Sequence, residues 1–242
     1  LKHQVNIVDA AVVFNRQQNY NCSFPIKYLF CKNDIVKYRL KEITEKKNSK
    51  ICFAADLDDP DKLMEILDKI GKHIVICKIH FDIFKDQEMI MLQLIEKSIE
   101  HDFLIMEDRK FNDISSIVQK QYEKFSSWVD LVTVHSLVSP DVVENLSGAL
   151  LVANMSNNSY DFSKDALQLA TDHKDNIVGF ITQNRIDCDD MVCMTPGISF
   201  KTSKTQDQNY RYHKDVDTDY FIIGRTLYEC DDIETAIKVF LP

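Results

Sequence analysis

Residues 103–114 read Phe-Leu-Ile-Met-Glu-Asp-Arg-Lys-Phe-Asn-Asp-Ile, an apolar run that ends in a cluster of charged residues. Strands covered on both faces are almost continuously apolar, so ionisable groups where such a strand ends are either solvated or functional. On a strand, Asp108 and Lys110 point to the same side. An isolated pair of this kind is usually a salt bridge at a strand terminus. The rest of the chain decides whether this pair belongs to a site.

The composition is that of a globular protein, with 242 residues of which 45% are hydrophobic and 28% charged. A formal net charge of −9, without a Lys/Arg-rich stripe, argues against a nucleic-acid partner. No apolar run approaches the roughly 20 residues of a membrane span, and no signal-peptide pattern is present. We therefore expect no membrane partner and a cytoplasmic location. The seven scattered cysteines, without a Cys-x-x-Cys pair, argue against a disulfide framework or a zinc site.

From residue 50 onward, short apolar runs alternate with stretches of helical spacing. The apolar runs predict eight strands, over 51–55, 73–78, 103–106, 130–134, 148–153, 177–182, 191–194 and 219–223. The amphipathic stretches predict helices over 61–70, 86–100, 114–124, 140–146, 162–173 and 232–240. Eight strands, mostly followed by helices, are the count of an α/β (β/α)₈ TIM barrel. A doubly wound open sheet is the alternative.

Three segments depart from the repeat. The link 185–190 is too short for a full helix, and the polar stretch 198–210 is predicted to be an irregular loop at the active site. Residues 1–49 contain an expected strand over 5–14 and a charged helix over 34–46. We interpret 1–49 as a short N-terminal appendage and 50–242 as the barrel domain.

Polar residues gather where the predicted strands end, and the active site of a barrel forms at this rim. In chain order they are Asp56, Lys78, His80, Asp108, Lys110, His135, Ser156, Gln183, Thr195-Pro196-Gly197 and Gly224-Arg225. Each has a simpler explanation on its own. Asp56 could cap the helix that follows Pro60, His135 could be a hydrogen-bonded core residue, and Lys78 could extend from the rim into solvent. Their concentration on one rim favours a site.

Gly224-Arg225 at the end of the eighth strand indicates a phosphorylated ligand. Phosphate sites in such barrels lie in the loops after strands seven and eight. Glycine permits close approach of the backbone, and arginine offers a fork of donors to phosphate oxygens. Gln208, Asn209 and Tyr210 could add amide and phenol donors from the preceding loop.

Residues 108–113, Asp-Arg-Lys-Phe-Asn-Asp, resemble the Asp-x-Lys-x-x-Asp signature of the orotidine 5′-monophosphate decarboxylase family in its eukaryotic form. Further segments match in register from about residue 50 to 240. They are Cys77–Ile83, Ser127–Val132, Val178–Ile181, Thr195–Gly197, Gln208-x-Tyr210 and Ile223–Arg225. The first segment, 5–17, is similar to the closing strand of an orotate phosphoribosyltransferase domain. That domain precedes the decarboxylase in animals, so 1–49 is expected to be its tail and a linker.

The resemblance implies decarboxylation of orotidine 5′-monophosphate to uridine 5′-monophosphate, without metal or cofactor, in pyrimidine biosynthesis. It implies that Lys110 stabilises and protonates the ring carbanion. It places Lys78 and Asp108 in the same catalytic network and directs Asp113 into the neighbouring site of a homodimer. The implied substrate contacts are Asp56 and Lys78 to the ribose, Ser156 to the ring, Pro196 in the site wall, and Gln208, Tyr210, Gly224 and Arg225 to the phosphate.

Some positions depart from the family pattern, and two other functions stay open. Ile117 replaces a threonine, Thr226 a glycine and Asn112 an alanine, and the segments 121–127 and 135–148 are short. These changes motivate a catalytically weak relative that acts as a nucleotide-binding or scaffolding protein. The other alternative is a magnesium-dependent barrel decarboxylase of sugar-acid phosphates, against which Lys78, Ser156 and the Gln208-x-Tyr210 pair argue.

Overall fold

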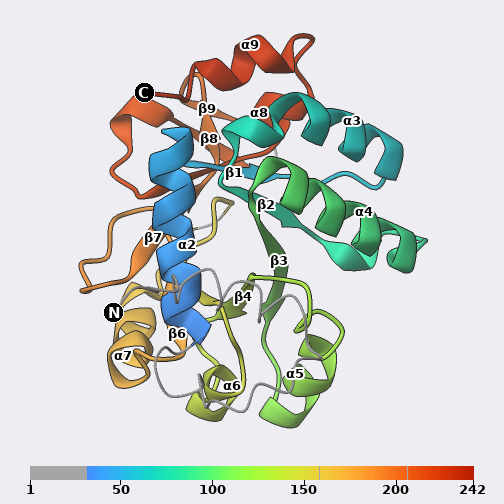
Figure 1. Cartoon of the computed structure of the whole chain (residues 1–242). Coiled ribbons are helices and arrows are strands. Elements are labelled where there is room, and N and C mark those ends of the chain that lie inside the picture. Colours follow the sequence, from blue (N-terminus) through green and yellow to red (C-terminus); the bar gives the residue numbers. More distant parts are fainter. Residues whose placement is uncertain (1–31, 158, 206) are drawn as a thin grey trace, which may run out of the picture.

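The computed structural model describes residues 32–157, 159–205 and 207–242, so the strand expected over 5–14 lies outside the described residues. Eight parallel strands close into a barrel in the order β1-β11-β7-β6-β5-β4-β3-β2 (Figure 1). Their bounds are β1 (Ile51–Ala54), β2 (Ile76–Ile79), β3 (Leu104–Phe111), β4 (Leu131–His135), β5 (Ala149–Val152), β6 (Ile177–Ile181), β7 (Val192–Pro196) and β11 (Tyr220–Ile223). The predicted TIM barrel is confirmed, and the open-sheet alternative is wrong.

All six predicted helices are present around the barrel (Figure 1). They are α3 (Pro60–Ile70), α4 (Gln87–His101), α5 (Ser115–Tyr122), α6 (Pro140–Glu144), α7 (Ser163–Asp172) and α9 (Ile233–Lys238), with the short α8 (Arg225–Tyr228) before α9. Single turns of 3₁₀ helix lie at η2 (Gly71–His73), η3 (Phe81–Ile83) and η4 (His213–Asp215). As expected, residues 182–191 between β6 and β7 form no helix. No helix within the described ranges is long and apolar enough to cross a membrane.

The stretch 198–210, predicted to be irregular, instead contributes to a small sheet. Its strands β8 (Ile198–Ser199), β9 (Ser203–Lys204) and β10 (Asn209–Tyr212) pair in the order β8-β10-β9. The prediction failed because these strands have only two to four residues and, apart from the buried Ile198, are largely polar and at least partly exposed, so they carry no alternation of apolar residues. Backbone pairing shapes the segment, and the sheet holds Gln208 and Tyr210 over the end of the barrel.

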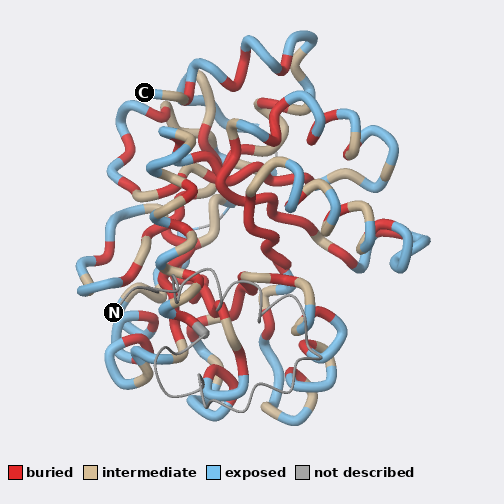
Figure 2. Tube along the Cα trace, viewed as in Figure 1, coloured by how far each residue is buried: buried red, intermediate tan, exposed pale blue. Residues whose placement is uncertain are grey.

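Alternate strand residues face opposite sides of the barrel wall, as the two-residue period of a strand requires. On β4, Val132 and Val134 belong to the core between strands and helices, whereas Leu131 belongs to the core inside the barrel. Figure 2 shows that the buried residues concentrate along the strands. Because the interior is packed with side chains, a ligand can be bound only at an end of the barrel.

Helix α2 (Lys32–Lys47) closes the end of the barrel where the strands begin and crosses it in Figure 1. Its residues Val36, Leu40 and Ile43 are at most 3% exposed and pack with the interior core. Burial of such side chains stabilises the fold by about 1.5–3 kcal/mol each. Asn33 receives a hydrogen bond from the N–H of Gly148, just before β5. The helix expected over 34–46 is therefore present, and the ends of the strands form the free rim. The domain boundary at residue 49 stays a prediction.

Candidate active site

A pocket opens at the carboxyl ends of the strands, and its lining falls into three groups. Charged and polar residues from β1, β2 and β3 line one side: Asp56, Lys78, His80, Asp108 and Lys110. Residues from the β10 segment and the end of β11 line another: Gln208, Tyr210, Gly224 and Arg225. Apolar side chains between them include Met155, Ile181, Pro196, Ile198 and Ile222. Most of the predicted rim residues thus converge on one cavity from several strands.

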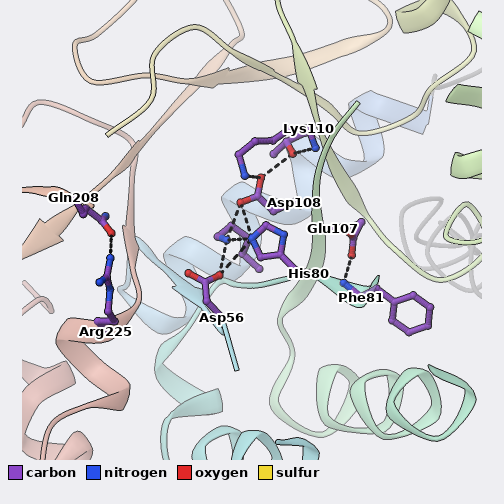
Figure 3. Close-up of polar contacts among 10 residues, drawn as sticks. Asp56, His80, Phe81, Glu107, Asp108, Lys110, Gln208 and Arg225 are labelled. Atoms are coloured by element: carbon purple, nitrogen blue, oxygen red, sulfur yellow. Dashed lines mark hydrogen bonds and ion pairs between the residues drawn. The ribbon is translucent and has the colours of Figure 1, made fainter. Parts of the chain in front are cut away.

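The charged side is an alternating chain of carboxylates and ammonium groups. Lys78 Nζ lies 2.9 Å from Asp56 Oδ1 and 2.8 Å from Asp108 Oδ2. The other carboxylate oxygen of Asp108, Oδ1, lies 2.8 Å from Lys110 Nζ. Figure 3 shows Asp108 between Lys110 on one side and Asp56 with His80 on the other. Asp108 therefore fixes the positions of two ammonium groups at once.

Because these side chains are buried, their charge states depend on the ion pairs between them. Burial of Asp108 opposes ionisation, but Lys78 and Lys110 outweigh it and hold the pKa of the carboxyl well below its ordinary value. Burial likewise opposes the charge of Lys78, yet Asp108 and Asp56 raise its pKa well above the ordinary value. Both groups are therefore charged at neutral pH. Removal of either partner would leave the other buried charge only partly compensated, by Asp56 or by Lys110.

The simpler explanation for Asp56 does not hold. Helix α3 is capped by Asp59, whose Oδ1 accepts the N–H groups of Asp61 and Lys62 at 3.0 and 3.2 Å. Asp56 is therefore free to face the pocket and pair with Lys78.

His80 also enters the pocket, although the sequence placed it on the rim without a role. Its Nε2 lies 3.4 Å from Lys78 Nζ, and 3.6 and 3.5 Å from Asp56 Oδ1 and Asp108 Oδ2. Burial, assisted by the charge of Lys78, lowers the pKa of His80. A neutral imidazole at this position can accept a hydrogen bond from the lysine ammonium.

A bulge in β3 separates the charges of the Glu107–Lys110 cluster. Its pairing with β4 runs from Glu107–Val132 to Phe111–Val134, so three residues of β3 face one residue of β4. Lys110 adopts a left-handed φ of 53° inside this bulge. Asp108 and Lys110 line the pocket, as the sequence predicted, whereas Arg109 is exposed outside it.

Glu107 is buried outside the pocket. Its Oε2 accepts the N–H of Phe81 at 2.9 Å, and its Oε1 has no hydrogen-bond partner among the described residues (Figure 3). Burial raises the pKa of this carboxyl to about 8, which the hydrogen bond from Phe81 only partly opposes. The carboxyl is therefore largely protonated at neutral pH.

Arg225 forms the anion-binding side of the pocket. Its Nη2 donates to Gln208 Oε1 at 2.7 Å (Figure 3). Its Nη1 donates to Asp207 Oδ1 at 3.1 Å. The guanidinium lies 5.9 Å from the centre of the Tyr210 ring, within the range of a cation–π contact. The sequence missed Asp207, because nothing distinguishes it there from other surface aspartates. Its carboxylate occupies donors that an anionic ligand would use.

Ser156 and Gly197 join the loop after β5 to the β10 segment. The carbonyl of Ser156 accepts the backbone N–H of Asn209 at 3.2 Å and its Nδ2 at 3.0 Å. Gly197 has a φ of 75°, and a Cβ at this position would lie 2.5 Å from the carbonyl oxygen of Asn209. Only glycine fits this close approach without strain.

The predicted site residues that do not line this pocket are Asp113, His135, Gln183, Thr195 and Asn209. Asp113 is exposed, and its Oδ1 accepts the N–H of Ile114 at 2.7 Å. Gln183 donates to the carbonyl of Pro196 at 3.2 Å and so supports the wall from behind. His135 is half-buried. Its pKa is lowered mainly by burial and to a smaller extent by the charge of Lys110. The substituted positions Asn112, Ile117 and Thr226 also lie outside the lining.

The described residues contain a group of potential metal ligands away from the pocket, formed by Asp68, Glu100 and His101. Lys97 already donates hydrogen bonds to both carboxylates. An ammonium at the centre of the group opposes binding of a second cation.

Comparison with known proteins gives one family and several relatives that the chain is similar to. Residues 49–240 match the model of the orotidine 5′-phosphate decarboxylase / HUMPS family. Orotidine 5′-phosphate decarboxylase of Komagataella pastoris is 32% identical over 222 residues, covering 80% of this chain and 84% of that protein. Uridine 5′-monophosphate synthase of Bos taurus is 31% identical over 228 residues, covering 85% of this chain and 48% of that protein. The chain thus spans about half the length of the bovine relative.

Solved structures agree on the fold. Orotidine 5′-phosphate decarboxylase from Pyrococcus horikoshii OT3 superposes with a TM-score of 0.64 at 19% identity, covering 79% of this chain and 97% of that one. The enzyme from Methanocaldococcus jannaschii, complexed with the inhibitor BMP, also gives 0.64, at 18% identity and with coverage of 79% and 96%.

Proposed function

The chain belongs to the orotidine 5′-phosphate decarboxylase / HUMPS family, and we propose that its pocket converts orotidine 5′-monophosphate to uridine 5′-monophosphate in pyrimidine biosynthesis. The observation that carries the proposal is the row of ion pairs Asp56–Lys78–Asp108–Lys110, which lies in a pocket that Arg225 also lines. Ammonium groups suit a reaction that develops negative charge, and the arginine suits a phosphate. An orotidine nucleotide presents a reacting ring carbon and a phosphate to these two groups.

The proposed chemistry uses Lys110 as the acid. The bond between ring carbon six and the carboxylate carbon breaks, carbon dioxide leaves, and the electron pair stays on carbon six. The Lys110 ammonium stabilises this carbanion and donates a proton to it, after which the amine regains a proton from solvent. Asp108 holds the Lys110 Nζ at 2.8 Å, which fixes where the proton is delivered. The step needs no electron acceptor, metal or cofactor.

The remaining predicted contacts follow from the same orientation of the nucleotide. Asp56 and Lys78 would bind the ribose hydroxyls, and Ser156 would contact the ring beside Pro196. Gln208, Tyr210, Gly224 and Arg225 would surround the phosphate, where binding energy can hold the β10 segment over the substrate. The apolar side chains of Ile181 and Ile222 support this orientation, because they offer a dry surface to a flat ring.

We further propose a homodimer in which Asp113 completes the site of the partner. Asp113 is exposed beside its own pocket without lining it, so its carboxylate is available to a neighbouring chain. Ile114 next to it is 65% exposed, and Leu137, in the loop after β4, is 59% exposed. Large apolar side chains that are exposed in the single chain are typical of a surface that a second subunit covers.

Absorbance-monitored turnover of orotidine 5′-monophosphate tests the reaction, with a chelator in one arm and magnesium in the other. We expect full turnover in the chelator arm. No detectable turnover at micromolar enzyme would overturn the proposal in favour of a nucleotide-binding relative. Dependence on added magnesium, together with turnover of a sugar-acid phosphate, would favour a magnesium-dependent decarboxylase of sugar-acid phosphates.

The cellular context is also a proposal. A cytoplasmic location agrees with the absence of a membrane-spanning helix among the described residues, and imaging of the tagged full-length protein tests it. The segment 5–17, which resembles part of a phosphoribosyltransferase domain, lies outside the described residues. The coding sequence upstream of Leu1 tests whether such a domain precedes the barrel.

A further inference from the structure

Thr133 is a buried polar residue that the sequence did not single out. It lies at the centre of β4, whose sequence Leu-Val-Thr-Val-His is otherwise apolar up to the rim, and it is 1% exposed. Because Leu131 faces the interior of the barrel, the two-residue period turns Thr133 to the same side. The residue thus lies one layer below the pocket, opposite the bulge of β3.

The hydroxyl of Thr133 links the two residues that matter most in the proposed reaction. Its Oγ1 donates to Asp108 Oδ1 at 2.8 Å and accepts the backbone N–H of Lys110 at 2.9 Å. The hydroxyl has one proton to donate, and an ionised carboxylate can only accept, so the directions of both bonds are fixed. Asp108 Oδ1 therefore receives the Thr133 hydroxyl and the Lys110 ammonium together.

The bulge explains why a side chain is needed at this point. Asp108, Arg109 and Lys110 stand opposite the single residue Thr133, so the regular backbone ladder is interrupted there. The N–H of Lys110 consequently bonds to a side chain, and an unpaired buried N–H would be costly. Lys110 also adopts a left-handed φ of 53°, which L-residues with a Cβ rarely take without support.

We infer that Thr133 is a positioning residue of the reaction, whose hydroxyl holds the Asp108 carboxylate and the Lys110 backbone in the arrangement that delivers the proton. The inference rests on the proposed function. Thr133 does not line the pocket, so it acts through Asp108 and Lys110 and leaves substrate affinity largely unchanged.

The test replaces Thr133 by valine, which keeps the shape and removes the hydroxyl, and by serine, which keeps the hydroxyl. We expect Thr133→Val to lower kcat by about 10- to 100-fold, the range for loss of a hydrogen bond to a charged group, with KM within about threefold. Thr133→Ser should restore kcat to within about threefold of the unmodified chain.

Thr218, just before β11, provides the matched control. It is a buried threonine whose Oγ1 donates a hydrogen bond to the carbonyl of Cys193 at 2.8 Å, and it does not line the pocket. Thr218→Val should leave kcat and KM unchanged. Thr133→Ala serves as a second variant without the hydroxyl in case valine impairs folding, which circular dichroism and binding of uridine 5′-monophosphate would reveal.

Two results would overturn the inference: a folded Thr133→Val or Thr133→Ala chain with normal kcat, or a loss of kcat that serine does not restore. Absence of turnover in the unmodified chain is a different result, because it would overturn the proposed function instead.

Discussion

Asp108 Oδ1 lies 2.8 Å from Lys110 Nζ, although a bulge separates the two residues from the regular pairing of β3. The pair is therefore not a salt bridge at an exposed strand end. The side chain of Asp108 is only 9% exposed, and its second oxygen binds Lys78. Burial strengthens each of these contacts and makes the position of the Lys110 ammonium a property of the whole network.

Asp207 is expected to compete with the substrate phosphate for Arg225. Its carboxylate accepts a hydrogen bond from Nη1 of Arg225 at 3.1 Å, and a phosphate must displace it to use both donors. Asp207→Asn should lower KM by about two- to fivefold without changing kcat, in keeping with the modest strength of an exposed pair.

Asp217→Asn is the control for this change, because Asp217 pairs with Arg185 outside the pocket at 3.0 Å. Steady-state kinetics of both variants provide the measurement. A rise in KM for Asp207→Asn would show instead that the carboxylate prepares Arg225 for binding.

Glu107 should make the stability of the fold depend on pH. Burial raises its pKa to about 8 from an ordinary value of 4.5, so between these limits the folded chain holds a proton that the unfolded chain releases. The free energy of unfolding therefore falls as the pH rises through this window, with a limiting slope of about 1.4 kcal/mol per pH unit from this group.

Glu107→Gln removes the titration and keeps an oxygen that can accept the Phe81 N–H. Urea unfolding at pH 5, 6.5 and 8 should show the glutamine variant gaining stability relative to the unmodified chain as the pH rises. A difference in stability that is constant with pH would contradict the protonated buried carboxyl.

The proposed homodimer, with a site shared between subunits, predicts complementation between two inactive chains. Lys110→Ala and Asp113→Ala should each be inactive alone. In a mixed dimer, one site combines both defects and the other is intact, so random re-association of equal amounts should recover about a quarter of the normal activity. The measurement is turnover after mixing, with each variant mixed with itself as the control. No recovery, in samples shown to exchange subunits, would contradict a site completed by Asp113.

Much of the fold could be predicted because burial leaves a periodic signal. The eight strands and six helices follow from apolar spacing, and the predicted ends of the strands place Asp56, Lys78, Asp108 and Lys110 at one rim. The sheet formed by β8, β9 and β10 could not be predicted, because its polar strands carry no such signal.

The finer features of the site depend on contacts between distant segments. The bulge at 108–110 exists only in relation to β4, so the link from Thr133 to Asp108 and Lys110 is invisible in the sequence. A lone hydroxyl at an inward position of an apolar strand was the only available hint. The effect expected of Asp207 likewise depends on its contact with Arg225, which lies 18 residues away along the chain.

The most direct test of the account is the Lys110→Ala variant, measured both for turnover of orotidine 5′-monophosphate and for binding of uridine 5′-monophosphate. Because Lys110 is assigned to the developing carbanion and Arg225 to the phosphate, we expect kcat to fall by about 10²–10⁴-fold or more. The dissociation constant of the product should change by less than about tenfold. Turnover that persists at a normal rate in a folded Lys110→Ala chain would contradict the central role assigned to this lysine.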